Sequence, residues 1–107
     1  MSDLRVLLVD DEVDFLDALA ERLRMKGFVV VAADGGEAAL EAVEAQTFDA
    51  IVLDMAMPGM DGIETLERLL EGNRIRQVIL LTGRATLEQA ATAIEKDILT
   101  SLHVGDS

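Results

Sequence analysis

The sequence contains no cysteine, tryptophan or tyrosine, and only three phenylalanines. Without cysteine there is no disulfide, no thiolate nucleophile and no cysteine-based zinc site, which fits a reducing compartment. Without tryptophan and tyrosine, the chain lacks the side chains that most often stack on nucleobases. Half of the residues are nevertheless hydrophobic, so leucine, valine, isoleucine, alanine and methionine must fill the core.

Basic residues are also scarce, with 9 lysines and arginines against 21 acidic residues and a formal net charge of −12. Such a chain repels nucleic-acid phosphates and anionic membranes, so we expect no direct binding to either. The first apolar run is too short for a signal peptide, and no run approaches the ~20 apolar residues of a membrane span. We expect one cytoplasmic domain over residues 1–107.

Short apolar runs alternate with stretches of helical periodicity along the chain. The strand-like runs are nearly continuous in aliphatic residues, as in strands that are buried on both faces. They lie at residues 4–9, 28–33, 50–54 and 77–82, and the helical stretches lie at 13–26, 38–45 and 63–71 and from 86 onward. Because strand and helix alternate four times with short connections, the sequence predicts an α/β fold with a parallel sheet and helices on both faces.

Three local signals mark the ends of these helices. Gly27 stands where a helix C-cap is expected, and Asp34 or Gly36 is a candidate N-cap for the second helix. Thr86 and Gln89 have the spacing of a capping box, which predicts a helix that opens there.

Polar side chains follow three of the predicted strands at the point where each strand ends. Asp10 and Asp11 follow the first strand, Asp54 ends the third and Thr82 ends the fourth. Ligands of open parallel sheets bind beyond these carboxyl ends, so we expect the four residues to lie close together. Clustered carboxylates need a compensating cation, and Mg²⁺ prefers oxygen ligands. A carboxylate beside such a metal can attack a phosphoryl group and form an acyl phosphate, with Thr82 donating a hydrogen bond to a phosphoryl oxygen.

A single aspartate after a strand is more often a turn former or a helix cap, and we read Asp34, Asp49 and Asp61 in that way. Turn formation and helix capping do not readily explain why acids and a hydroxyl occur together at three strand ends. His103 by itself indicates no site, and neither a GxxxxGK[ST] loop nor a GxGxxG turn after a strand is present.

Three stretches of the sequence closely resemble the receiver domain of two-component response regulators. They are VLLVDDE at residues 6–12, IVLDMAMPGMDG at 51–62 and VILLTGRAT at 78–86. The acid pair, the loop and the strand-terminal threonine occur in the order and spacing of that family, and the resemblance covers roughly residues 4 to 95. It implies a doubly wound, flavodoxin-like sheet with strand order 2-1-3-4.

The resemblance also implies a role for each matching residue. Asp54 is the expected phosphoacceptor, which receives its phosphoryl group from a phosphohistidine on a sensor histidine kinase or phosphotransfer protein. Asp11, Asp54 and the backbone carbonyl of Ala56 are the expected ligands of Mg²⁺, and Asp10 supports the metal through water. Thr82 is the expected switch hydroxyl.

The sequence departs from the family near its C-terminus. Receivers place a lysine, usually followed by proline, at the end of a fifth strand, where Val104 and Gly105 stand here. Asp97 replaces the glycine that normally ends the fourth helix. Only residues 106 and 107 follow, so we expect no fifth helix. Arg84 or Lys96 is a candidate replacement for the missing cation.

The segment KDILTSLHVGDS, residues 96–107, has two readings. It forms either a degenerate fifth strand or a continuation of the fourth helix. We favour the helix, because apolar residues recur at helical spacing along one stripe: Leu87, Ala91, Ile94, Ile98 and Leu102. In both readings one face of the sheet loses a covering helix, so we expect a homodimer, formed by segment exchange through the long helix or otherwise.

Three functions are compatible with these residues. The first is a phosphorylatable receiver that signals through Thr82 and the fourth helix. The second is a pseudo-receiver, in which the fold serves as a protein-binding or dimerisation module without phosphorylation. The third, a metal-dependent phosphatase, would require a second acid two residues after Asp54, where Ala56 stands. We therefore favour the first and keep the second as its alternative.

Overall fold

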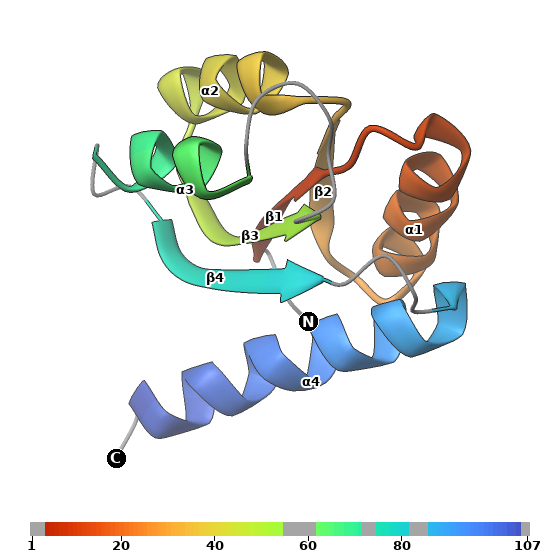
Figure 1. Ribbon diagram of the computed structural model, residues 1–107. Coiled ribbons are helices and arrows are strands. Elements are labelled where there is room, and N and C mark those ends of the chain that lie inside the picture. The colour runs from red at the N-terminus through yellow and green to blue at the C-terminus, as the bar shows by residue number, and fades with distance from the viewer. Residues whose placement is uncertain (1–3, 55–61, 72–74, 82–85, 106–107) are drawn as a thin grey trace.

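The computed structural model describes residues 4–54, 62–71, 75–81 and 86–105 (Figure 1). Four strands alternate with four helices in these residues, as the sequence predicts. The strands are β1 (Arg5–Val9), β2 (Val29–Ala33), β3 (Phe48–Asp54) and β4 (Ile75–Leu81), and the helices are α1 (Val13–Met25), α2 (Gly36–Ala45), α3 (Gly62–Glu71) and α4 (Leu87–Gly105).

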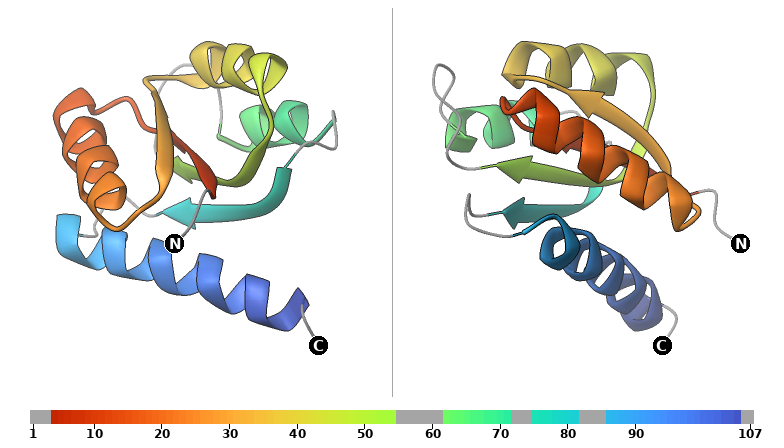
Figure 2. Two further views of the ribbon diagram at one scale, coloured as in Figure 1. Left: turned by 180° about the vertical axis from the view of Figure 1, so that it is seen from behind. Right: turned by 90° about the vertical axis from the view of Figure 1, so that its right-hand side faces the viewer.

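The strands form one parallel sheet in the order β2-β1-β3-β4, which confirms the predicted topology. The chain moves outward from β1 to β2 and then crosses back to β3 on the other side of β1. Because parallel crossovers are right-handed, this reversal places α1 on one face of the sheet and α2 and α3 on the other, as Figure 2 shows. The strand order therefore reverses between β1 and β3.

The central strands are buried on both faces. Alternate residues of β1 point to opposite sides, so Val6 and Leu8 join the core beneath α1, while Leu7 and Val9 join the core beneath α2 and α3. All four side chains are at most 2% exposed. Such two-sided burial explains why the sequence of these strands is a continuous aliphatic run rather than an alternating one.

Helix α4 runs from Leu87 to Gly105 without a break, so the extended helix is confirmed and no fifth strand forms over those residues. It lies on the same face as α1 and contacts both α1 and β4. Its buried residues include Ala90, Ala91, Ile94 and Ile98, each at most 2% exposed. The expectation that helix one alone would leave this face partly uncovered is wrong, because α4 packs beside α1 and completes the cover.

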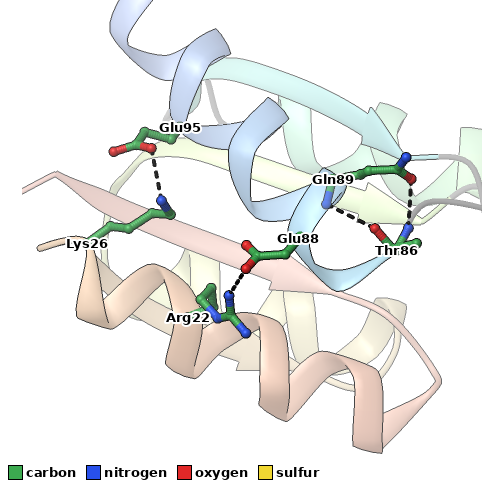
Figure 3. A network of polar contacts seen from close by, with 6 residues as sticks. All are labelled: Arg22, Lys26, Thr86, Glu88, Gln89 and Glu95. Carbon is green, nitrogen blue, oxygen red and sulfur yellow. Dashed lines mark hydrogen bonds and ion pairs between the residues drawn. The ribbon is translucent and has the colours of Figure 1, made fainter.

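Two ion pairs join α1 to α4 along the outside of their contact (Figure 3). Arg22 of α1 pairs with Glu88 in the first turn of α4. One turn further along α1, the Lys26 Nζ lies 3.1 Å from Glu95 Oε1. The two helices are therefore held in register by charge as well as by apolar contact.

The predicted capping box at the start of α4 is confirmed (Figure 3). The Gln89 backbone N–H donates to Thr86 Oγ1 at 3.1 Å, and the Thr86 backbone N–H donates to Gln89 Oε1 at 3.1 Å. These reciprocal bonds satisfy two backbone donors that the helix itself cannot satisfy.

Glycine has a local role at the ends of α1 and α2. Gly27 has φ +103°, the left-handed conformation that glycine adopts freely, and it directly follows Lys26, which is the C-cap of α1, so the predicted cap is off by one residue. The cap predicted for α2 is wrong, because Gly35, which has no side chain to form a capping bond, occupies the N-cap between the two candidates. The turn is set by the backbone there rather than by an aspartate side chain.

Candidate functional site

The candidate site lies where β1 and β3 end side by side. Val9 is the register partner of Leu53, so the residues that follow the two strands emerge together at the carboxyl edge of the sheet. Asp10 and Asp11 directly follow β1, and Asp54 is the last residue of β3. This edge is also the point at which the strand order reverses, where ligands of open α/β sheets bind.

The three aspartates form a compact cluster. One carboxylate oxygen from each of Asp10, Asp11 and Asp54 lies within 4.8 Å of the others. Asp54 is only 6% exposed, and among the described residues it is the one polar side chain that is buried. Asp11 is exposed to solvent. The cluster therefore has a buried floor and an open side, and the structure brings together the three acids that the sequence singled out.

The backbone around Asp10 fixes this carboxylate. The Asp10 N–H donates to the Ala33 carbonyl at 3.1 Å, which extends the pairing of β1 with β2 by one residue. The Glu12 N–H donates to Asp10 Oδ1 at 2.9 Å and closes a tight turn. Sequence reasoning did not identify these two backbone partners, although an aspartate two residues before a helix N-cap, here Glu12, is a usual sign of such a bond.

The pKa of Asp10 is raised from 3.8 to about 6. Burial is the largest cause, followed by repulsion from Asp54, a hydrogen bond with the Asp54 side chain, and repulsion from Asp11. The bond from the Glu12 N–H acts in the opposite direction. Burial, together with the crowding of negative charge, therefore favours a proton on Asp10 unless a cation neutralises the cluster.

This arrangement has two chemical capabilities. Three carboxylates at one point supply the oxygen ligands that a hard cation such as Mg²⁺ requires. Asp54 also stands on a strand that is paired on both sides, with β1 and with β4, so its carboxylate is held rigidly. A rigid carboxylate next to a cation is suited to attack a phosphoryl group.

The other predicted site residues are placed less completely. Thr82, Ala56 and Arg84 lie outside the described residues. Leu81, which precedes Thr82, is the register partner of Asp54. Val104, at the position where receivers carry lysine, lies in α4, and Lys96 is an exposed residue of the same helix.

Comparison with known proteins gives a family match over nearly the whole chain. The profile of the response regulator receiver domain matches residues 6–103. The transcriptional regulatory protein ZraR of Escherichia coli K12 is 34% identical over 100 residues, which cover 94% of this chain and 23% of that protein. PrrA of Mycobacterium tuberculosis is 39% identical over 92 residues, covering 85% of this chain and 39% of that protein. The chain thus spans less than half the length of these relatives.

Solved structures give the same fold. A CheY-like receiver domain from Methanospirillum hungatei superposes with a TM-score of 0.75 at 19% identity and covers 95% of this chain and 98% of that one. The response regulator TrrA of Thermotoga maritima, solved in complex with Mg(2+)-BeF, is 32% identical with a TM-score of 0.68 and covers 77% of this chain and 71% of that one. No helix in the described residues is long and apolar enough to cross a membrane.

Proposed function

Because this chain belongs to the response regulator receiver domain family, we propose that it accepts a phosphoryl group on Asp54 from a phosphohistidine of a sensor histidine kinase or phosphotransfer protein. One observation carries the proposal: the carboxylates of Asp10, Asp11 and Asp54 meet within 4.8 Å at the ends of the two central strands. The domain is a signalling phosphoacceptor rather than an enzyme with a separate substrate.

The acidic cluster is the proposed binding site of Mg²⁺. Asp11, Asp54 and the backbone carbonyl of Ala56 are the proposed direct ligands, and Asp10 acts through water. The donor set supports this assignment, because carboxylate and carbonyl oxygens are what Mg²⁺ prefers. The complex of the 32% identical TrrA with Mg(2+)-BeF also supports it. A bound ion would supply positive charge that offsets the carboxylates of the cluster and the phosphoryl group.

In the proposed step, a carboxylate oxygen of Asp54 attacks the phosphorus of the phosphohistidine. A P–O bond forms while the P–N bond breaks, and the leaving imidazole takes up a proton. The product is an aspartyl phosphate, which is a mixed anhydride. Asp54 is suited to this role, because it is 6% exposed and its strand is paired on both sides.

The switch is the finer part of the proposal. Thr82 follows β4 directly, and four residues separate it from the start of α4 at Leu87. We place the Thr82 hydroxyl as the group that bonds to a phosphoryl oxygen, and α4 as the element that changes its contacts with partner proteins. The short chain distance between β4 and α4 supports this route.

Acetyl phosphate provides the direct test. Incubation of the chain with acetyl phosphate and Mg²⁺ should add the mass of one phosphoryl group, and Asp54→Asn should abolish the gain. Asp17→Asn, which removes an exposed acid of α1, is the matched control and should behave as the original chain. EDTA should also prevent the gain. No added mass in the original chain under these conditions would refute the proposal.

A pseudo-receiver is the second candidate, and one observation favours it. The position that matches the family's lysine, Val104, lies inside α4, so the cation that faces the phosphoacceptor in other receivers is replaced. In that case the fold acts as a binding module, and Asp54→Asn leaves partner binding unchanged. Partner binding that depends on Asp54 and Mg²⁺ would exclude this alternative.

The homodimer remains a prediction, with exchange of α4 as its route. The contacts of α4 with α1 and β4 can form between two copies as well as within one, because exchange preserves every contact. Sedimentation of the chain at micromolar concentration tests it, and a clean monomer contradicts it.

A further inference from the structure

Strand β2 forms one edge of the sheet. It stands first in the strand order, and among the described residues it pairs with β1 alone. The Val29 N–H donates to the Leu4 carbonyl at 3.0 Å, and the Ala33 carbonyl accepts from the residue after β1 at 3.1 Å. Successive residues of a strand direct their backbone groups to opposite sides. The N–H and C=O groups of Val30 and Ala32 therefore face outward, away from β1.

The sequence of this strand favours pairing with further strands. Residues 28–33 read FVVVAA, without a charged residue, a proline or a glycine. Short uncharged segments rich in β-branched and aromatic residues are those that most readily associate through their backbones. Soluble proteins commonly place a charge or a proline on an exposed edge strand to prevent this, and β2 has neither in its own sequence.

The neighbouring helices leave parts of β2 uncovered. Val30 is 6% exposed and belongs to the core beneath α1. Ala32, two residues further along the same face, is exposed, so α1 does not cover the carboxyl half of the strand. On the opposite face Val29 is 46% exposed, so α2 does not cover the amino half. The strand is therefore open to solvent on one face at each end.

A charged side chain of α1 reaches this edge. Arg24 lies in the last turn of α1, and its Nη2 donates to the Val30 carbonyl at 2.9 Å in a partly buried contact. This carbonyl is one of the outward groups of β2. A hydrogen bond from a guanidinium is stronger than one between neutral groups. Arg24 thus occupies an acceptor that an added strand would need for its own N–H.

We propose that Arg24 prevents the β2 edge from pairing with the β2 edge of a second copy of this chain. The β2 edge consists of the outward N–H and C=O groups of Val30 and Ala32. Two copies related by a two-fold axis would place the same apolar segment opposite itself. In an antiparallel pair centred on Val31, Val30 of one copy would face Ala32 of the other.

Arg24 opposes this pairing in two ways. Each copy would have to break its bond from Arg24 to the Val30 carbonyl before the two strands could exchange hydrogen bonds. The two-fold axis would also bring both guanidinium groups to the same short stretch of strand, where like charges repel. The positive charge that β2 lacks is therefore supplied by the helix that precedes it.

Replacement of Arg24 tests the proposal. Arg24→Ala should self-associate at a concentration about tenfold lower than the original chain requires, because a charge-assisted bond no longer competes for the Val30 carbonyl. Sedimentation measures this, starting from a dilution at which the original chain is a monomer. Hydrogen exchange of the Val30 and Ala32 amides should slow in the associated form. Arg24→Met keeps the aliphatic part of the side chain and should associate like Arg24→Ala, which separates loss of the guanidinium from loss of packing.

Two further variants control for charge and for location. Arg22→Ala removes the same charge from the same helix and should associate as the original chain does. Ala32→Lys, added to Arg24→Ala, places a new charge on the edge strand at an exposed position and should restore the original behaviour.

Four results would each overturn the proposal. They are unchanged association of Arg24→Ala, equal association of Arg22→Ala, slowed exchange on β4 instead of β2, and failure of Ala32→Lys to reverse the effect. None of these outcomes depends on phosphorylation of Asp54.

Discussion

The central strands β1 and β3 are buried to a different degree from the edge strand β4. β1 and β3 have a paired strand on each side and helices on both faces, so all their residues except Arg5 and Asp49 are buried. β4 has one paired edge, one face under α4, and one face on which Leu80 is half exposed. The acidic cluster lies at the ends of β1 and β3, and the pairing of β3 on both sides fixes the position of Asp54.

The comparison also separates two parts of receiver function. In the proposed function, accepting a phosphoryl group requires Asp54 at the end of β3 and the two aspartates that follow β1. Passing a signal onward would require a surface that changes, and the later part of α4, with Asp97 and Val104, is where the sequence departs from the receiver pattern. Variants in the two regions should therefore have different signatures.

Core truncations should give the largest effects. Ile51→Ala in β3 and Ile94→Ala in α4 each remove a side chain that is 0% exposed, and each should lower the free energy of unfolding by about 2–5 kcal/mol. Ile51→Ala should lie at the upper end, because both neighbouring strands limit collapse around the cavity. Urea unfolding measures both, with Thr92→Ala on the exposed side of α4 as control. An effect of Ile94→Ala as small as the control would show that α4 contributes little to the fold.

Neutralising the acidic cluster should change how stability depends on pH. The pKa of Asp10 is about 6 in the folded chain against 3.8 for the free group, so the folded state holds the proton more tightly. Stability should therefore fall as pH rises from about 4 to 6, and the cost should persist above that range. Asp10→Asn should remove this slope and stabilise the chain at pH 8 by about 1 kcal/mol, after allowance for solvent screening of a partly exposed group.

Mg²⁺ provides the control for this variant. Added at pH 8, it should raise the melting temperature of the original chain more than that of Asp10→Asn, because the variant offers the ion one negative charge fewer. If the stability of Asp10→Asn depended on pH in the same way as that of the original chain, charge crowding in the cluster would be contradicted.

Loss of the cap on α4 should have a moderate effect. Thr86→Ala removes the acceptor for the Gln89 N–H and should cost about 1 kcal/mol of stability. Thr92→Ala, in the middle of the same helix, keeps all capping bonds and is the appropriate control. Chemical unfolding of the two variants side by side measures the difference, and equal stabilities would contradict a structural role for the capping box.

The ion pairs between α1 and α4 should give the smallest effect. The Arg22 and Glu88 side chains are 35% and 69% exposed, and such pairs typically contribute about 0.2–1 kcal/mol. A double-mutant cycle of Arg22→Ala and Glu88→Ala should give a coupling in this range that disappears at high salt. A coupling that survives 1 M salt would mean that the pair is not screened as its exposure implies.

The sequence predicted the central region better than the margin, for a physical reason. Strands buried on both faces leave an aliphatic signature, and the residues after them must emerge at one edge, so the cluster of Asp10, Asp11 and Asp54 followed from the pattern. The periodic stripe of α4 likewise distinguished a helix from a fifth strand. These signals are local or depend only on strand direction.

The face on which α4 packs was not predictable in the same way. Crossover handedness fixes the face of a helix only when a parallel strand follows it, and no strand follows α4 in the described residues. Its position depends instead on Ala90, Ala91 and two ion pairs to α1, contacts between residues more than 60 positions apart. The prediction of the α2 N-cap failed for a related reason, since backbone geometry rather than side-chain type determined the turn at Gly35.

The length of α4 has a mechanical consequence. Nineteen residues in one unbroken helix span about 28 Å at ~1.5 Å per residue. A tilt of about 5° at Leu87 would move the far end at Gly105 by roughly 2.4 Å over that length. Helix α4 is thus a lever that begins six residues after β4 ends at Leu81, the register partner of Asp54. Small displacements at the acidic edge of the sheet would therefore produce larger displacements at the far end of α4.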